Sequence, residues 1–585
     1  MSKGDPAVKY NISHFQQPTH TASSNSFRVA KNWIQVCREQ HDCGNRRPFL
    51  LGSKDLLSSV PSRLIDLRPA DISHPDARLV NMSDLDDPRE QYVTLSHCWG
   101  GSLEFKAISS NILQLQEQII YDSLPRTFRD AIVIARGMGV RYLWIDALCI
   151  LQDSFEDWSR ESRNMGQIYM NALFTIAASA SQDGDGGCFN KRSTSQEELL
   201  EIAATITNTL SSGVKSCLYI WAPKEKVADG REFDAIATHV DHSPLAHRGW
   251  VLQERILSPR TLHYTQMQLF WECRHTYAAE DGLRTWLPTR QSTSNLIVGF
   301  TEDNEGPGSF NSAWRGLSVK QINLIGHWYQ EIISRNYSGR LLTVSKDKLT
   351  AVSSLARLMA TQISEYEYVT GIWLIRGTQQ AVSSFGLAWR CPRTTVRCQE
   401  YRAPSFSWAS VDGYVIWPDF DEFNTQDYTL PVVPRYNVEL EGGELNGDTF
   451  GRIASATVFL EGKIFIARIS PEFREGCPEI VNECYHPVSN EEKTQLRVWS
   501  LLDASWIGDA YVDSDAEPGL VLCLQLGSML FATHATITVL LLVSVDNVKR
   551  EENVYRRVGV GRIPVSLTGS KVDPSSWEKE TIAIM

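Results

Sequence analysis

The amino-acid sequence predicts an α/β N-terminal domain with a mostly parallel sheet, followed by two helices and a β-rich C-terminal domain. The first part of this prediction rests on residues 124–179, where two helical patterns alternate with two short apolar runs. Strands that alternate with helices of this length are typical of a parallel sheet covered on both faces. The last part rests on residues 368–570, where short alternating apolar runs are separated by turn residues.

The composition limits the compartment and the partners. The 585 residues include 57 Lys and Arg against 69 Asp and Glu, a formal net charge of −12, so we expect no nucleic-acid partner. Twelve cysteines are scattered without a dense framework, which is typical of a reducing compartment such as the cytoplasm. Leu520–Val545 carries no charged residue, but polar residues interrupt it and Gly527-Ser528 divides it. Two buried strands joined by a turn therefore explain it better than a membrane span.

The N-terminal segment contains three metal-capable side chains. Residues 1–27 are polar without a hydrophobic signal core, and we expect a disordered tail. An amphipathic helix is predicted from residue 28, and it runs into Cys37-x3-His41-x-Cys43. Three ligands are too few for a closed zinc site, and no second local pair completes them. We therefore expect no metal, and we interpret these residues as packing and helix termination.

The next elements alternate between strands and helices. Short strands are predicted at Leu64–Arg68, Arg78–Asn81, Tyr92–Ser96, Tyr142–Ile145 and Leu173–Ala178. Thr127 and Asp130 form a capping pattern that predicts a helix start, and Gly139 predicts its end. Ser154 and Asp157 repeat the capping pattern for a second helix.

The second of these helices carries an unusual carboxylate. Glu161 falls inside the apolar stripe that faces the core, although most of its charged neighbours lie outside it. A buried carboxylate is costly unless it is paired or hydrogen-bonded. Glu161 is therefore either a satisfied structural link or part of a functional site.

Three predicted strands end at polar or glycine-rich segments. These segments are His97–Gly101, Asp146 and Ser179–Ser181. Ligands bind at the carboxyl edge of open parallel sheets, so we expect a ligand site there. The residues that we expect to contact the ligand are Ser96, His97, Trp99, Gly100 and Asp146. Neighbouring side chains in a strand point to opposite faces, so a Cys98 nucleophile would need a distant histidine such as His247 or His263.

The remaining sequence gives weaker signals. A helix is predicted at Arg248–Leu257, and its residues Arg248, Gln253 and Glu254 either contribute polar groups to the sheet edge or pair with one another. Further predictions are a hairpin at 260–274, an insertion without an assigned role at 190–240, a linker at 276–317, and helices near 318–333 and 346–361, within a C-terminal part that spans 318–585.

Three blocks resemble the fungal heterokaryon-incompatibility (HET) domain. They are YVTLSHCWGG (92–101), the segment 124–179, and the segment 248–273 with RGWVLQERILSPRTLHY and WEC. Their order and spacing are similar to those of that family, which implies a HET domain over residues 28–275. The resemblance implies a fungal, cytoplasmic protein that triggers programmed cell death in non-self recognition.

A more remote resemblance links the same region to Toll/interleukin-receptor (TIR) domains. The arrangement of strand, loop, helix and strand, followed by a helix with Trp158-x-x-Glu161, resembles theirs. It implies a TIR-like, flavodoxin-like sheet with insertions, NAD as the substrate, and Glu161 as the catalytic residue of an NAD glycohydrolase. The alternative is a non-enzymatic signalling module that acts by self-association or by binding another host incompatibility protein. The sequence leaves both open.

Overall fold

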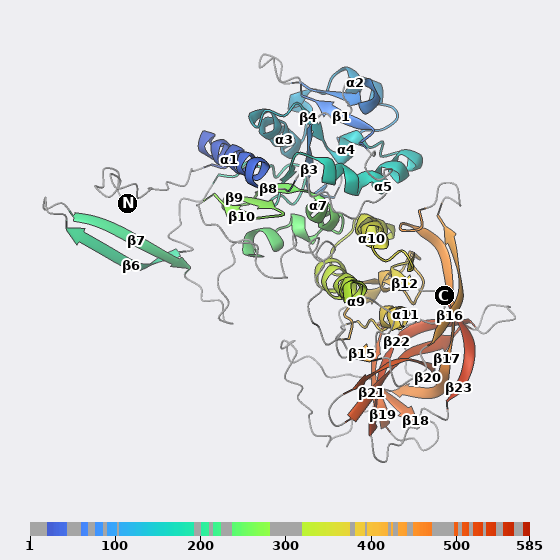
Figure 1. The fold of residues 1–585 in the computed structure, drawn as a ribbon. Helices are drawn as coiled ribbons and strands as arrows, with labels where there is room; N and C mark the ends of the chain where they lie inside the picture. Colours follow the sequence, from blue (N-terminus) through green and yellow to red (C-terminus); the bar gives the residue numbers. More distant parts are fainter. Residues whose placement is uncertain are drawn as a thin grey trace. The chain divides into compact units, whose positions relative to one another are not determined.

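The chain forms two compact units, the first made of residues 1–47 and 53–295 and the second of residues 48–52 and 296–585 (Figure 1). The computed structural model describes residues 20–41, 43, 60–67, 76–85, 91–101, 105–191, 200–209, 215–223, 237–280, 319–374, 381–391, 395–418, 423–424, 431–441, 448–470, 496–500, 506–513, 519–530, 534–545, 554–566 and 577–585.

An eight-stranded sheet with the order β10-β9-β8-β5-β3-β4-β1-β2 forms the centre of the first unit. Its strands are β1 (Arg63–Asp66), β2 (Arg78–Asn81), β3 (Tyr92–Ser96), β4 (Tyr142–Trp144), β5 (Thr175–Ala177), β8 (Arg260–Tyr264), β9 (Leu269–Cys273) and β10 (Tyr277–Ala279). A separate hairpin consists of β6 (Leu200–Thr209) and β7 (Lys215–Pro223).

The sheet is mixed, and the prediction of a mostly parallel sheet is wrong. The four central strands β4, β3, β5 and β8 are parallel. On one side β1 and β2 pair antiparallel, and on the other side β8, β9 and β10 do so. The connections between β1 and β2 and along β8–β10 are shorter than the dozen or so residues that a parallel crossover needs, so these neighbours must run antiparallel.

Helices cover both faces of this sheet (Figure 1). They are α1 (Ser24–Gln40), α2 (Ile112–Glu117), α3 (Arg126–Gly137), α4 (Asp146–Cys149), α5 (Phe155–Asn171) and α7 (Val251–Leu257). From β3 to β4 the chain steps across the sheet in one direction, and from β4 to β5 and on to β8 it steps across the sheet in the opposite direction. Right-handed crossovers therefore place α3 on one face and α5 and α7 on the other.

Capping differs between the two helices for which it was predicted. Ser154 caps α5, because its hydroxyl accepts the N–H of Asp157 at 3.3 Å. The capping prediction for α3 is wrong, since this helix begins at Arg126 after Pro125. The Thr127 hydroxyl instead accepts the N–H of Gly187 at 3.0 Å, and Asp130 accepts those of residues 188 and 189 at 2.8 and 3.0 Å. These side chains tie the segment after β5 to α3.

The second unit begins with helical segments and continues with strands. The helical segments are α9 (Val319–Gly326), η8 (His327–Tyr337), η9 (Ser345–Lys348), η10 (Thr350–Val352) and α10 (Ser353–Ala360), in the two regions where helices are predicted. Short hairpins β11–β12 (Glu367–Val369, Ile372–Leu374) and β13–β14 (Val396–Arg397, Val411–Asp412), helix α11 (Ala381–Leu387) and η11 (Trp408–Ser410) follow.

Six antiparallel strands of the second unit close into a ring. They are β17 (Ile453–Ser470), β18 (Leu496–Ser500), β19 (Trp506–Val512), β20 (Gly519–Leu530), β21 (His534–Ser544) and β22 (Val554–Ser566), with β15 (Phe423–Asn424), β16 (Val432–Leu440) and β23 (Glu578–Ile584) attached. The ring closes because β17 pairs with β18 and also with β20. Apolar residues at alternate positions, such as Val521, Cys523, Val539 and Leu541, fill a core.

The apolar segment Leu520–Val545 is a pair of strands, as predicted. Gly527, however, lies within β20 at a register shift between Gln525 and Gly527, so the prediction of a turn at Gly527-Ser528 is wrong. A glycine inside a strand commonly marks such a bulge. None of the described helices combines the length and apolar composition that crossing a membrane requires.

A buried charge network connects the ring to α11 within the second unit. Arg557 on β22 donates to the carbonyl oxygen of Leu387 at 3.0 Å and to that of Trp389, and its guanidinium lies over the Trp389 ring. Asp513 lies 3.6 Å from Arg557 Nε and 2.9 Å from Arg397 Nη2. The side chains of Arg557 and Asp513 are fully buried. Burial lowers the pKa of Arg557 to about 10, and Asp513 opposes this shift.

Candidate functional site

The carboxyl ends of the parallel strands meet at one edge of the sheet. Across the sheet the four parallel strands lie in the order β4-β3-β5-β8. The first connection in the chain, from β3 to β4, leads to one side of β3, and the next, from β4 to β5, leads to its other side. The winding direction therefore reverses between β3 and β5. Ligands of doubly wound sheets bind outside such a reversal point. His97–Gly101 follow β3, residues 178–181 follow β5, and Asp146 follows β4. This edge is the candidate functional site.

Three of the predicted ligand-contacting residues come together at this edge. The indole N–H of Trp99 donates to Asp146 Oδ2 at 2.9 Å, and His97 Nδ1 lies 3.7 Å from Asp146 Oδ1. The Asp146 side chain is 20% exposed, whereas the His97 ring is buried and packs edge-on against Phe128. Asp146 and half-buried Trp99 thus face solvent, with His97 behind them.

His97 is neutral at pH 7. Burial lowers its pKa to about 4, Asp146 opposes this shift, and Arg248 adds to it. Arg248 also donates a hydrogen bond to the His97 carbonyl oxygen. The buried His97 Nε2 has no hydrogen-bond partner among the described residues, and the same holds for both side-chain polar atoms of buried Gln253. A neutral imidazole can donate or accept one hydrogen bond at that nitrogen.

Ser96, also predicted, pairs with a carboxylate on α7. Its hydroxyl donates to Glu254 Oε2 at 2.5 Å, and both residues are buried. Burial raises the pKa of Glu254 to about 7; hydrogen bonds from Ser96 and Tyr169 and the charge of Arg248 lower it, whereas Asp146 raises it. Glu254 therefore changes protonation near neutral pH, a property that is common in catalytic carboxylates.

A positive φ and a close neighbour both favour glycine at position 100, and neither feature is found at position 101. Gly100 has a φ of +74°, and a Cβ atom there would lie 2.8 Å from Asp183 Cβ. A Cβ at Gly101 would meet nothing within 4 Å. The sequence predicts a close backbone approach or a tight turn for the glycine pair, and the structure shows a close approach, to Asp183, at Gly100.

Gly100→Ala is expected to lower the free energy of unfolding by about 1–3 kcal/mol, because alanine resists this φ and contacts Asp183. Gly101→Ala is the matched control, with an expected change within about 0.5 kcal/mol. Denaturant unfolding of both variants beside the wild type measures the difference. Equal stabilities of the two variants would contradict the strain at Gly100.

Cys98 lacks the features of a nucleophile. Burial raises the pKa of its thiol, so the neutral form is favoured. His263, one of the two histidines considered as an activating base, instead lies 3.2 Å from Ser179 Oγ and 3.0 Å from Glu272 Oε2 through its two ring nitrogens. Cys98 contributes instead to a small apolar cluster with Ala177 and Val251.

Glu161 lies at the same edge of the sheet, one strand further out. It is fully buried, and it accepts hydrogen bonds from the hydroxyl of Ser62 and from the Ser62 N–H at 3.4 Å. Arg160 Nε lies 3.4 Å from its carboxylate. Burial raises the pKa of Glu161, and the Ser62 hydrogen bonds and Arg160 lower it. Because β1 runs antiparallel to β4, Ser62 precedes β1 at the edge where β4 ends.

The raised pKa of Glu254 predicts a pH-dependent effect of Glu254→Gln. A carboxyl group with a folded-state pKa near 7 and an ordinary value of 4.5 binds a proton more tightly in the folded state. Its contribution to stability is complete below pH 4.5 and is lost as the pH rises through 7. Glutamine does not titrate, so the Glu254→Gln variant does not lose stability in this pH range. The free energy of unfolding of the variant minus that of the wild type should therefore rise by about 3 kcal/mol from pH 4.5 to pH 8. Denaturant unfolding at several pH values tests this; a difference that does not change with pH would contradict it.

The sequence alone places Glu254 only among residues that either reach the sheet edge or pair with one another. All seven residues of α7 are buried, so the helix has no polar face against which a charged residue stands out. In the sequence, the one feature that could have indicated Glu254 is a glutamate placed among the apolar residues of WVLQERIL.

Among the described residues, the one group of Cys, His and carboxylate side chains spaced for a metal ion lies away from the candidate site, at the end of α1.

Comparison with known proteins identifies the region that contains this site. The family model described as "Heterokaryon incompatibility protein (HET)" matches residues 92–254, from the start of β3 to Glu254. No curated protein and no solved structure matches the chain, and the resemblance to TIR domains gains no support from these comparisons. The match covers the first two sequence blocks and the start of the third, so residues 92–254 of this chain match a heterokaryon incompatibility (HET) domain.

Proposed function

We propose that this HET domain is a cell-death effector of heterokaryon incompatibility that cleaves the bond between nicotinamide and ribose in NAD, with Glu254 as the reactive carboxylate. One observation carries the proposal: a buried carboxylate with a pKa near 7 is held by Ser96 where the sheet reverses its winding. NAD as the substrate rests on the sequence resemblance to TIR domains, a resemblance that assigns the catalytic role to Glu161 and not to Glu254.

The chemistry requires a fixed negative charge in a site that excludes water. When nicotinamide leaves, the ribose gains oxocarbenium character, and an adjacent carboxylate stabilises this charge. A water molecule then adds to the ribose carbon, and the carboxylate accepts a proton from it, which gives ADP-ribose, nicotinamide and a proton. Ser96 would fix the orientation of Glu254 through its hydrogen bond. Since the carboxylate must be ionised, the rate should rise with pH through about 7.

The surroundings of Glu254 offer groups that could bind a nucleotide. Trp99 presents an aromatic ring, and His97 Nε2 and Gln253 present polar atoms without a partner among the described residues. Because Glu254 is only 5% exposed, the substrate must displace the side chains that cover it. Glu161 is the second candidate for the reactive carboxylate, since it is also buried at this edge.

The purified full chain is expected to consume NAD and release nicotinamide, measured by chromatography, and its expression in a fungal host is expected to deplete NAD before viability falls. Cell death without NAD loss would overturn the enzymatic proposal. It would favour the non-enzymatic module, which acts by self-association or by binding another host incompatibility protein.

A further inference from the structure

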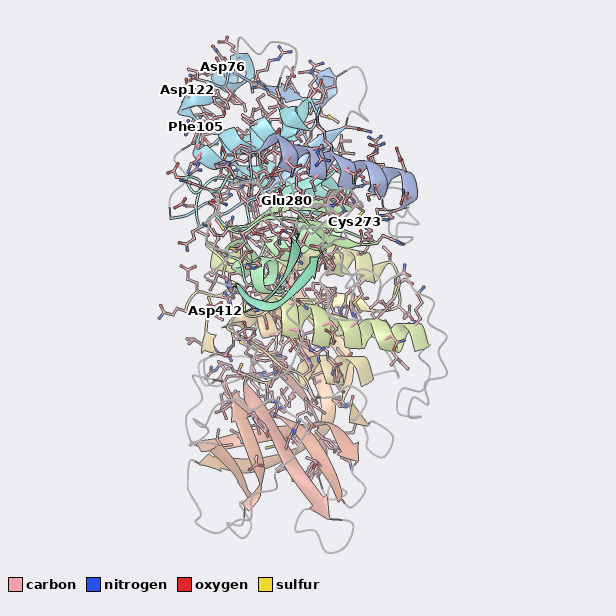
Figure 2. All side chains as sticks on the ribbon, turned by 90° about the vertical axis from the view of Figure 1, so that its left-hand side faces the viewer. Asp76, Phe105, Asp122, Cys273, Glu280 and Asp412 are labelled. Atoms are coloured by element: carbon pink, nitrogen blue, oxygen red, sulfur yellow. The ribbon has the colours of Figure 1, made fainter. Side chains whose placement is uncertain are left out.

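Three cysteines and one histidine face one another where α1 ends beside β9. The sulfur atoms of Cys37, Cys43 and Cys273 and a ring nitrogen of His41 all lie within 4.8 Å of one another. In Figure 2, Cys273 lies just below the blue helix α1. The three cysteines are buried and His41 is half-buried. We call these four residues the Cys3His cluster.

Two distant parts of the chain build this cluster. Cys37 lies in the last turn of α1, and the backbone N–H of His41 donates to its carbonyl oxygen at 3.2 Å. His41 has an extended backbone, with φ −116° and ψ 140°, and its ring nitrogen lies within 4.8 Å of Cys43 Sγ. His41 and Cys43 can therefore face one centre. Cys273, the last residue of β9, supplies the fourth ligand.

The spacing fits a tetrahedral zinc ion. Cys273 Sγ lies 3.5 Å from His41 Nδ1. With Zn–S bonds of about 2.3 Å and Zn–N bonds of about 2.0–2.1 Å, tetrahedral ligands lie about 3.6 Å (S to N) and about 3.8 Å (S to S) apart. Both values fall within the 4.8 Å limit that holds for the whole cluster.

Hydrogen-bond donors surround the sulfur atoms. The backbone N–H of Thr276 donates to Cys273 Sγ at 3.3 Å, and Arg260 Nε donates to Cys37 Sγ at 3.2 Å. Donors of this kind stabilise thiolates and orient them toward a metal, as the outer partners of zinc ligands do. Neutral thiols buried among apolar residues gain little from such donors.

We propose that Cys37, His41, Cys43 and Cys273 bind one Zn²⁺ ion. Four protein ligands leave no open position for water, so the site is structural and would fix α1 to strand β9. The sequence prediction of no metal rested on three local ligands, and the fourth lies 230 residues further along the chain. The site is independent of the proposed NAD chemistry, and all four ligands lie outside the matched residues 92–254.

Metal content and the cobalt spectrum test the site in the full chain. Protein expressed with zinc and purified with a reductant should contain about one zinc per chain, and the Co²⁺-substituted protein should show the absorption of a tetrahedral thiolate complex. Cys43→Ser and Cys273→Ser should lose the metal. Cys188→Ser, which alters a buried thiol of the same unit, is the matched control and should keep it.

Substitution of the histidine gives a second test that does not depend on losing a thiol. His41→Cys should keep the metal and strengthen the thiolate-to-cobalt absorption, because it replaces one ligand by another. If the serine variants fail to fold, the wild-type zinc content and the His41→Cys spectrum still decide. Wild-type protein without bound zinc, an octahedral cobalt spectrum, a cobalt spectrum unchanged by His41→Cys, or a disulfide among the three cysteines found by mass spectrometry would each overturn the proposal.

Discussion

Glu254→Gln is expected to lower the rate of NAD cleavage by about 100-fold or more, the scale associated with loss of one electrostatic group at a transition state. Glutamine keeps the shape of the side chain and can still accept the hydrogen bond from Ser96. It cannot supply the negative charge that stabilises the ribose. Nicotinamide release by the purified variant measures the loss, and thermal unfolding shows that the protein is folded.

Glu161→Gln tests the second candidate for the reactive carboxylate in the same assay. It also replaces a buried glutamate by glutamine at the same edge of the sheet, but Glu161 is bound by Ser62 rather than by Ser96. If Glu254 is the reactive carboxylate, the rate of Glu161→Gln should stay within a few-fold of the wild type. A folded Glu254→Gln protein with normal activity beside an inactive Glu161→Gln protein would transfer the catalytic role to Glu161. Normal activity in both variants would remove both carboxylates from the mechanism.

Asp513→Ala is expected to destabilise the second unit by about 3–5 kcal/mol, because it leaves Arg557 buried without its counter-charge. The hydrogen bonds of Arg557 to Leu387 and Trp389 remain, but carbonyl oxygens do not neutralise a guanidinium. Denaturant unfolding of the full chain measures the change in the transition that belongs to this unit.

Glu331→Ala is the control for this stability measurement. Its ion pair with Arg335 is partly exposed and joins residues four apart, so we expect a loss of less than about 0.5 kcal/mol. A cost below about 1 kcal/mol for Asp513→Ala would show that the buried network contributes little beyond an ordinary surface pair.

The sequence predicts local elements well and long-range pairing poorly. Strands β2, β3 and β8 have the predicted bounds, since period-two patterns and turn residues are local signals. Thr127 and Asp130 carry a valid capping pattern, yet they bind the segment 183–189, which lies near them only in the folded chain. Closure of the ring between β17 and β20 likewise depends on pairings that no local pattern contains.

In the candidate site, too, the sequence predicts what local patterns determine and misses what depends on contacts between distant residues. The carboxyl ends of parallel strands meet at one edge of a sheet. Knowing where the strands end in the sequence is therefore enough to predict that His97, Trp99 and Asp146 lie close together. The partner of Ser96 is beyond this rule, since Glu254 on α7 lies 158 residues away from Ser96 along the chain. Glu161 attracts attention because its helix is long enough to show an apolar stripe, whereas the seven buried residues of α7 show none.

Along the chain, the hairpin β6–β7 is inserted between β5 and β8, which are neighbouring strands of the central sheet. The entropy of closing a loop grows only with the logarithm of its length, so each doubling costs about 0.6 kcal/mol. A long insertion at this point therefore costs the sheet little more than a short one. The length of this segment can therefore change while the strands on either side, and the carboxylate that follows it on α7, stay in place.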